Sequence, residues 1–158
     1  MNILPVTLHY FFYLLLTQQP NISGTWEGKI ADSQVRDQYD SVTIHLKLSL
    51  SADNKISGTS ICYYANNYYK ECSLSGKMYK KQDGFFIQEE TITGTNFPNK
   101  PAIHIDRYDL TFIKEDSSRL NGEATCTRSA LRCHENIFFS LKRSDSDPDK
   151  MKETNKEQ

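Results

Sequence analysis

Residues 42–50 (VTIHLKLSL) alternate strictly between apolar and polar side chains, and this period of two constrains the fold most. The aliphatic residues share one face and the polar residues share the other, which predicts a half-buried β-strand with His45 exposed to solvent. No segment shows the period of an amphipathic helix. Similar short runs follow along the chain, at 22–30, 56–64, 72–80, 85–92, 107–114, 119–127 and 136–142.

Turn-forming residues separate several of these runs, as in 51–55 (SADNK), 82–84 (QDG) and 115–118 (EDSS). Eight short strands with no helical crossover between them predict an all-β fold. The arrangement we expect is an eight-stranded antiparallel meander barrel, and the alternative is a β-sandwich.

The two ends of the chain differ from the rest. Residues 1–16 are mostly apolar, and no charged residue precedes Glu27. A membrane-spanning helix needs about 20 apolar residues, so we expect a secretory signal peptide over 1–19, with a buried strand or an uncleaved anchor as alternatives. The protein would then be secreted or periplasmic, with no stable membrane span after processing. Residues 144–158 are rich in charge and predict a disordered tail, which leaves 20–143 as the β-barrel domain.

Length and charge narrow the functional classes. A chain of 158 residues fits a single domain of this kind, and a formal net charge of −1 argues against a nucleic-acid partner. Sequence motifs for hydrolases, zinc proteases, P-loops or dinucleotide binding are absent, so the sequence predicts neither a cofactor nor a metal.

The four cysteines, Cys62, Cys72, Cys126 and Cys133, form an even set in a chain expected to be exported, which favours disulfides. Local bonds Cys62–Cys72 and Cys126–Cys133 would each close a hairpin tip. The crossed bonds Cys62–Cys126 and Cys72–Cys133 are the alternative. A zinc site is the weaker interpretation because no C-x-x-C spacing occurs.

The segment between the first two cysteines has the composition of a recognition surface. It carries four tyrosines and two asparagines, and Tyr64, Tyr68 and Tyr69 are candidate ligand-binding residues. Cross-strand tyrosine pairs that stabilise a hairpin are the alternative interpretation. The long connection 93–106 adds Phe97, which could cap the mouth of a barrel.

A pair of acidic residues carries the remaining candidate for chemistry. Glu89 and Glu90 lie in the middle of a predicted strand, where alternation turns one carboxylate toward the interior. An inward Glu89 could bind a ligand. It could also act as an acid or base in a small barrel enzyme of the cyclase or isomerase type, which is the alternative function.

Gly24-Thr25-Trp26 at the start of the first strand resembles the opening of the calycins, the lipocalins, fatty-acid-binding proteins and avidins. Ser57-Gly58-Thr59 is similar to the avidin group. The resemblance implies a barrel that can hold a small apolar ligand, with Arg143 packed over Trp26 as a structural lock at the barrel floor. Trp26 is the only tryptophan, whereas avidins line their biotin site with several.

The sequence as a whole therefore predicts a secreted, non-catalytic binding protein. Its partner is either a small hydrophobic ligand or another protein, and the oligomeric state stays open.

Overall fold

The computed structural model describes residues 21–30, 42–64, 67–81, 83–97, 106–126 and 137–145. The predicted signal peptide, Cys133 and most of the predicted tail lie outside these residues. The strands are β1 (Gly24–Ile30), β2 (Val42–Leu50), β3 (Lys55–Tyr63), β4 (Tyr69–Met78), β5 (Gly84–Thr95), β6 (Asp106–Ile113), β7 (Asp116–Cys126) and β8 (Ile137–Ser144).

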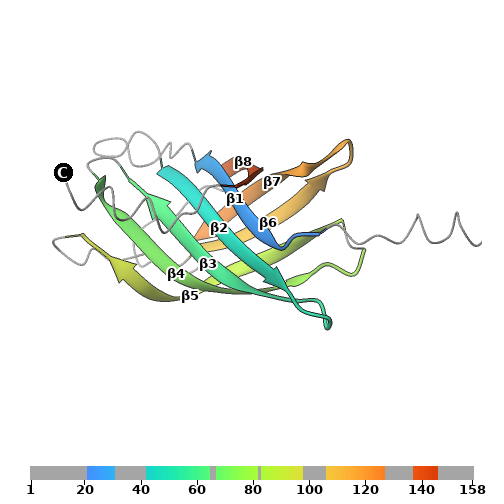
Figure 1. Ribbon diagram of the computed structural model, residues 1–158, viewed down its shortest axis with the longest axis horizontal. Coiled ribbons are helices and arrows are strands. Elements are labelled where there is room, and N and C mark those ends of the chain that lie inside the picture. Colours follow the sequence, from blue (N-terminus) through green and yellow to red (C-terminus); the bar gives the residue numbers. More distant parts are fainter. Residues whose placement is uncertain are drawn as a thin grey trace, which may run out of the picture.

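The strands form one closed barrel, in which every strand pairs antiparallel with its neighbours in sequence and β1 also pairs with β8. Figure 1 shows this barrel from the side, with β1 and β8 next to each other. The eight-stranded antiparallel meander barrel predicted from the sequence is confirmed, and the alternative β-sandwich is wrong.

Alternation along each strand fills the interior with large apolar side chains, because successive residues point to opposite faces of the sheet. One set of large inward side chains, which we call the inward row, is buried except for Phe112, which is only partly buried. The buried members of the inward row are Leu46, Leu48, Ile87, Tyr108, Leu110 and Phe139.

The two ends of the barrel carry connections of different length. The β2–β3, β4–β5 and β6–β7 connections are short and lie at one end, on the right in Figure 1. The β1–β2, β5–β6 and β7–β8 connections at the opposite end are longer, and only the β3–β4 connection there is short. We call the first end the closed end and the second the open end.

The closed end is fastened around Trp26, which is fully buried and donates a hydrogen bond from Nε1 to the Ile22 carbonyl at 2.9 Å. Arg143 lies opposite it on β8, with its guanidinium 4.5 Å above the indole ring. The same guanidinium donates hydrogen bonds to the carbonyls of Ser23 and Asn21. This is the contact that the calycin resemblance implies.

Gly24 makes the close approach of Arg143 possible. Its φ of +127° lies in a region that side-chain-bearing residues rarely adopt. A Cβ at this position would lie 2.9 Å from Arg143 Nη1. Gly24 therefore allows both the positive φ of the backbone and the close approach of the Arg143 guanidinium.

His45 departs from the expectation of a solvent-exposed side chain. It lies on the outward face of β2, as alternation predicts, but it is only 2% exposed. Its ring packs edge-on against Tyr63 at 5.7 Å. Neither ring nitrogen has a hydrogen-bond partner in the described part of the chain, and burial lowers the pKa of the imidazole despite the nearby Glu27 carboxylate. The outer face of β2 is thus not uniformly solvated.

Candidate functional site

Charged and polar side chains replace the apolar core toward the open end of the barrel. Glu89 of β5 is fully buried and points inward, whereas Glu90 is exposed and accepts a hydrogen bond from Ser75. The register between β4 and β5 shifts between Ser73 and Leu74, and the residue skipped by this shift is Glu90. The expectation that one of the two carboxylates turns inward is met by Glu89.

The Glu89 carboxylate accepts hydrogen bonds from four donors, which lie on the three strands β3, β4 and β6. Oε1 accepts hydrogen bonds from Ser60 Oγ at 2.7 Å and from the Tyr108 hydroxyl at 3.0 Å. Oε2 accepts from Lys70 Nζ at 2.7 Å and from the backbone N–H of Asp106 at 3.2 Å. A buried carboxylate needs such partners, because an uncompensated buried charge is strongly destabilising.

Lys70 connects this buried carboxylate to a second one at the mouth. Its ammonium is 3% exposed and lies 2.7 Å from Glu89 Oε2 and 3.5 Å from Asp106 Oδ2. The Asp106 side chain is 27% exposed, so the ion pairs run from the dry interior to the rim. We call Ser60, Lys70, Glu89, Asp106 and Tyr108 the inner network.

The pKa values of Lys70 and Tyr108 in this region are shifted away from neutral pH. Burial disfavours the Lys70 ammonium, but the acidic groups around it, among them Cys62 and Glu89, raise its pKa well above the ordinary value. Burial raises the pKa of Tyr108 well above its usual range. Lys70 therefore stays protonated at neutral pH, and Tyr108 stays a hydrogen-bond donor.

The predicted Cys62–Cys72 disulfide is wrong, because both cysteines are buried free thiols. In the β3–β4 register Cys62 faces Lys70 and Cys72 faces Ser60, so the cysteines are diagonal rather than directly opposite. Diagonal neighbours lie about 7–8 Å apart, beyond the usual reach of a disulfide. Burial raises the pKa of each thiol to about 12. Cys133 and the side chain of Cys126 lie outside the described residues.

The aromatic candidates from two separate segments meet above the inner network. Phe97 stacks on Tyr68 with 5.0 Å between ring centroids and packs edge-on against Tyr64 at 5.2 Å. Tyr64 also packs against the hydrophobic core, and burial raises the pKa of its hydroxyl. We call Tyr64, Tyr68 and Phe97 the aromatic cluster. Tyr69 instead forms the cross-strand pair with Tyr63, at 6.5 Å, which was the alternative interpretation of these tyrosines.

Asn96 holds the two segments together. Its side-chain carbonyl accepts a hydrogen bond from the Tyr69 backbone N–H at 2.7 Å, and its amide donates to the Asn67 carbonyl at 2.9 Å. Thr95 adds a hydrogen bond from Oγ1 to the Tyr69 carbonyl at 3.0 Å. The β3–β4 hairpin is therefore fixed to the end of β5 by the Asn96 side-chain amide and the Thr95 hydroxyl.

Sequence reasoning missed Lys70, Asp106 and Ser60 as members of the site. Lys70 has the same parity as Cys72, which predicts an inward side chain, but the predicted strand began only at residue 72. The structure begins β4 at Tyr69. Extending the strand by three residues would have placed a lysine inside the barrel.

No protein-family model matches the chain, and no curated protein is similar to it in sequence. Among the described residues, no group of three or more histidine, cysteine or acidic side chains is placed to hold a metal ion. The same residues contain no helix long and apolar enough to cross a membrane. The site must therefore be interpreted from its own geometry.

Proposed function

We propose that the protein is a non-catalytic binding protein, and that it holds a small ligand at the open end of the barrel. The ligand's apolar part would contact the aromatic cluster, and a polar group would reach Asp106 at the rim of the inner network. The observation that carries this proposal is the contact of Tyr64 and Tyr68 with Phe97. These residues come from two segments, and Asn96 hydrogen-bonds the two segments together at the open end of the barrel.

The inner network supports this proposal because a buried ion pair contributes less to folding stability than apolar residues in its place often would. Replacing a buried ion pair by well-packed apolar residues is often neutral or stabilising by about 1–4 kcal/mol. The closed barrel has a large apolar core that includes Trp26 and Phe85. A buried Lys70–Glu89 pair that extends to the rim through Asp106 is consistent with a role at the surface above it.

Binding is favoured over the alternative enzymatic function by the protonation states. A nucleophile or general base works best when its pKa lies near the operating pH. The pKa values of Cys62 and Cys72 are raised to about 12, and that of Lys70 is raised further from neutrality. Glu89 is fully buried and already accepts four hydrogen bonds. These pKa shifts and hydrogen bonds favour a role for the inner network as a fixed polar surface beneath a ligand, rather than as a set of reacting groups.

A protein partner is the second candidate, and the filled interior favours it. The inward row from Leu46 to Phe139 is packed into one core, so the ligand would sit at the mouth rather than deep inside. The tyrosines of the β3–β4 hairpin, together with Phe97 after β5, also suit a surface that binds another protein. The same proposal includes a relationship to the calycins, which the Trp26–Arg143 contact supports. It also includes export through a signal peptide over 1–19.

A fluorescence titration with the neutral apolar probe N-phenyl-1-naphthylamine tests the small-ligand proposal. We expect saturable binding that Phe97→Ala weakens about tenfold, because an aromatic contact contributes about 0.5–1.5 kcal/mol beyond its buried area. Phe138→Ala is the matched control, since Phe138 is 73% exposed on the outer face of β8.

Equal weakening by Phe97→Ala and Phe138→Ala, or no saturable binding at all, would contradict the small-ligand proposal. If the probe does not bind, native mass spectrometry of the purified protein is the next test. The absence of any retained small molecule would then favour the protein partner.

A further inference from the structure

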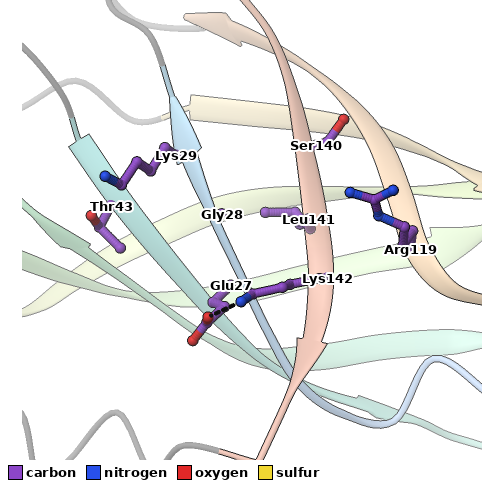
Figure 2. Close-up of a pocket in the computed structure, with 8 residues that line it drawn as sticks. All are labelled: Glu27, Gly28, Lys29, Thr43, Arg119, Ser140, Leu141 and Lys142. Carbon is purple, nitrogen blue, oxygen red and sulfur yellow. Dashed lines mark ion pairs between the residues drawn. The ribbon is translucent and has the colours of Figure 1, made fainter.

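A recess lies on the outside of the barrel, away from the open-end site. It has a volume of about 290 Å³ and lies where β7, β8, β1 and β2 run side by side. Figure 2 shows Lys29 on one side of the β8–β1 pair and Arg119 on the other, with Glu27 and Lys142 between them. We call this recess the outer groove.

The strand register explains why these side chains gather. Arg119 lies opposite Lys142, and Lys142 lies opposite Glu27, so the three form one row across β7, β8 and β1. The next row along the strands on this outward face places Ser140 opposite Lys29, which in turn lies opposite Thr43. Two neighbouring rows thus supply three cations, one carboxylate and two hydroxyls.

The charges of the outer groove do not balance. Lys142 Nζ pairs with Glu27 Oε1 at 3.0 Å, and Ser144 Oγ donates to Glu27 Oε2 at 2.8 Å. The one carboxylate of the groove is therefore occupied by a cation of the same groove. Lys29 and Arg119 make no ion pair of 4 Å or less with any described residue. The nearby Asp116 carboxyl, whose pKa is lowered first by hydrogen bonds from Ser118 and then by the Arg119 charge, does not line the groove, so two cations face the recess.

We propose that the outer groove binds an oxyanion with more than one charge, a phosphate ester or a diphosphate. The Arg119 guanidinium can donate two parallel hydrogen bonds to one phosphate group, and Lys29 supplies a second point charge across the recess. The Ser140 hydroxyl between them donates its proton to Asn121 Oδ1 at 3.0 Å, so the two cations are the donors that the groove offers to an anion. The Glu27–Lys142 pair closes one end of the groove and sets its limit.

The proposal is independent of the open-end site. The outer groove uses outward residues of β7, β8 and β1, whereas the aromatic cluster lies at the β3–β4 hairpin and the end of β5. A phosphate group could come from a free metabolite or from a lipid headgroup, and the two sources share the same chemistry.

Isothermal titration calorimetry of the whole protein with inorganic pyrophosphate, at low ionic strength, tests the proposal. We expect binding that Lys29→Gln and Arg119→Gln each weaken about two- to fivefold, as single exposed ion pairs do, and that the double variant weakens about four- to 25-fold. Lys77→Gln is the matched control, because Lys77 is an exposed lysine on β4, outside the groove. Co-sedimentation with vesicles that contain a phosphoinositide provides the lipid arm.

Binding in either arm that depends on Lys29 and Arg119 supports the proposal, and the arm that binds more tightly identifies the source of the phosphate. The proposal is overturned if neither probe binds, or if Lys77→Gln weakens binding as much as Arg119→Gln. The second result would show attraction to general positive charge rather than a site.

Discussion

The two ends of the barrel solve the same packing problem with different chemistry. At the closed end, Trp26 is buried under the Arg143 guanidinium, which stays at the surface and stacks on the ring. At the open end, Lys70 and Glu89 are buried inside the barrel as an ion pair. The closed end places its charged group, Arg143, over the outer face of an aromatic ring, whereas the open end buries its charged groups, Lys70 and Glu89, inside the barrel.

The difference indicates which end is built for stability alone. Stacking an arginine over a tryptophan leaves the cation hydrated on one side, so it costs little desolvation. Burying a lysine and a glutamate costs several kcal/mol per ion before the pair recovers it. The open end therefore carries a costly arrangement that the closed end does without, which is why we propose that binding takes place at the open end.

Removing the carboxylate from the inner network has the largest expected effect. Glu89→Leu leaves Lys70 buried without its closest partner, and we expect a loss of about 3–5 kcal/mol in the free energy of unfolding, measured by urea denaturation. The double variant Glu89→Leu/Lys70→Met should recover most of this loss. A single variant as stable as the wild type would break the comparison, because the open end would then carry no stressed charge.

Deleting one donor to Glu89 tests the same network more gently. Tyr108→Phe removes the hydroxyl that donates to Oε1 at 3.0 Å, and keeps the ring that packs edge-on against Phe139. We expect about 1.5–3 kcal/mol of destabilisation, as for a hydrogen bond to a charged group. Tyr79→Phe, which removes a hydroxyl at the outer surface bonded to Asp109, is the control with a smaller expected loss. Equal losses would show that burial of the acceptor does not matter.

Arg143→Lys sharpens the comparison from the closed end. Lysine keeps the charge but loses the planar group that stacks on Trp26 and donates to two carbonyls. We expect a loss of about 1–2 kcal/mol in thermal or urea unfolding, and a shift in Trp26 fluorescence. A lysine variant with wild-type stability and emission would mean that the lock is only a surface contact.

His45 gives the smallest effect, in the pH dependence of stability. Burial lowers its pKa in the folded state, so the unfolded state binds more protons as the pH falls through the unfolded pKa. Stability is complete above that value and decreases below it, by at most about 0.7 kcal/mol between pH 7 and pH 6. His45→Gln should remove this slope in urea unfolding at the two pH values. An unchanged slope would assign the pH dependence to other groups.

The strand pattern predicted the barrel because a period of two is a local property that the sequence carries residue by residue. Glu89 was found in the same way, since it shares a face with Phe85 and Ile87. Its partners Ser60, Lys70 and Asp106 come from other strands, and only the register between strands brings them together.

The false disulfide has the same origin. Cys62 and Cys72 are close along the chain, but the register places them diagonally and leaves both thiols free. Spacing in sequence measures the length of a hairpin, and it does not tell which residues stand opposite each other. The outer groove depends on register in the same way, because its charges come from β1, β7 and β8.

Amide mapping by ¹H–¹⁵N NMR during titration with N-phenyl-1-naphthylamine tests the central claim, that the open end is the binding end, most directly. We predict that the amide signals of Tyr64, Tyr68 and Phe97 shift with one saturating curve, while the indole N–H of Trp26 at the closed end stays in place. Shifts that begin at the Trp26 indole, or that spread evenly over the outer strands, would contradict the account.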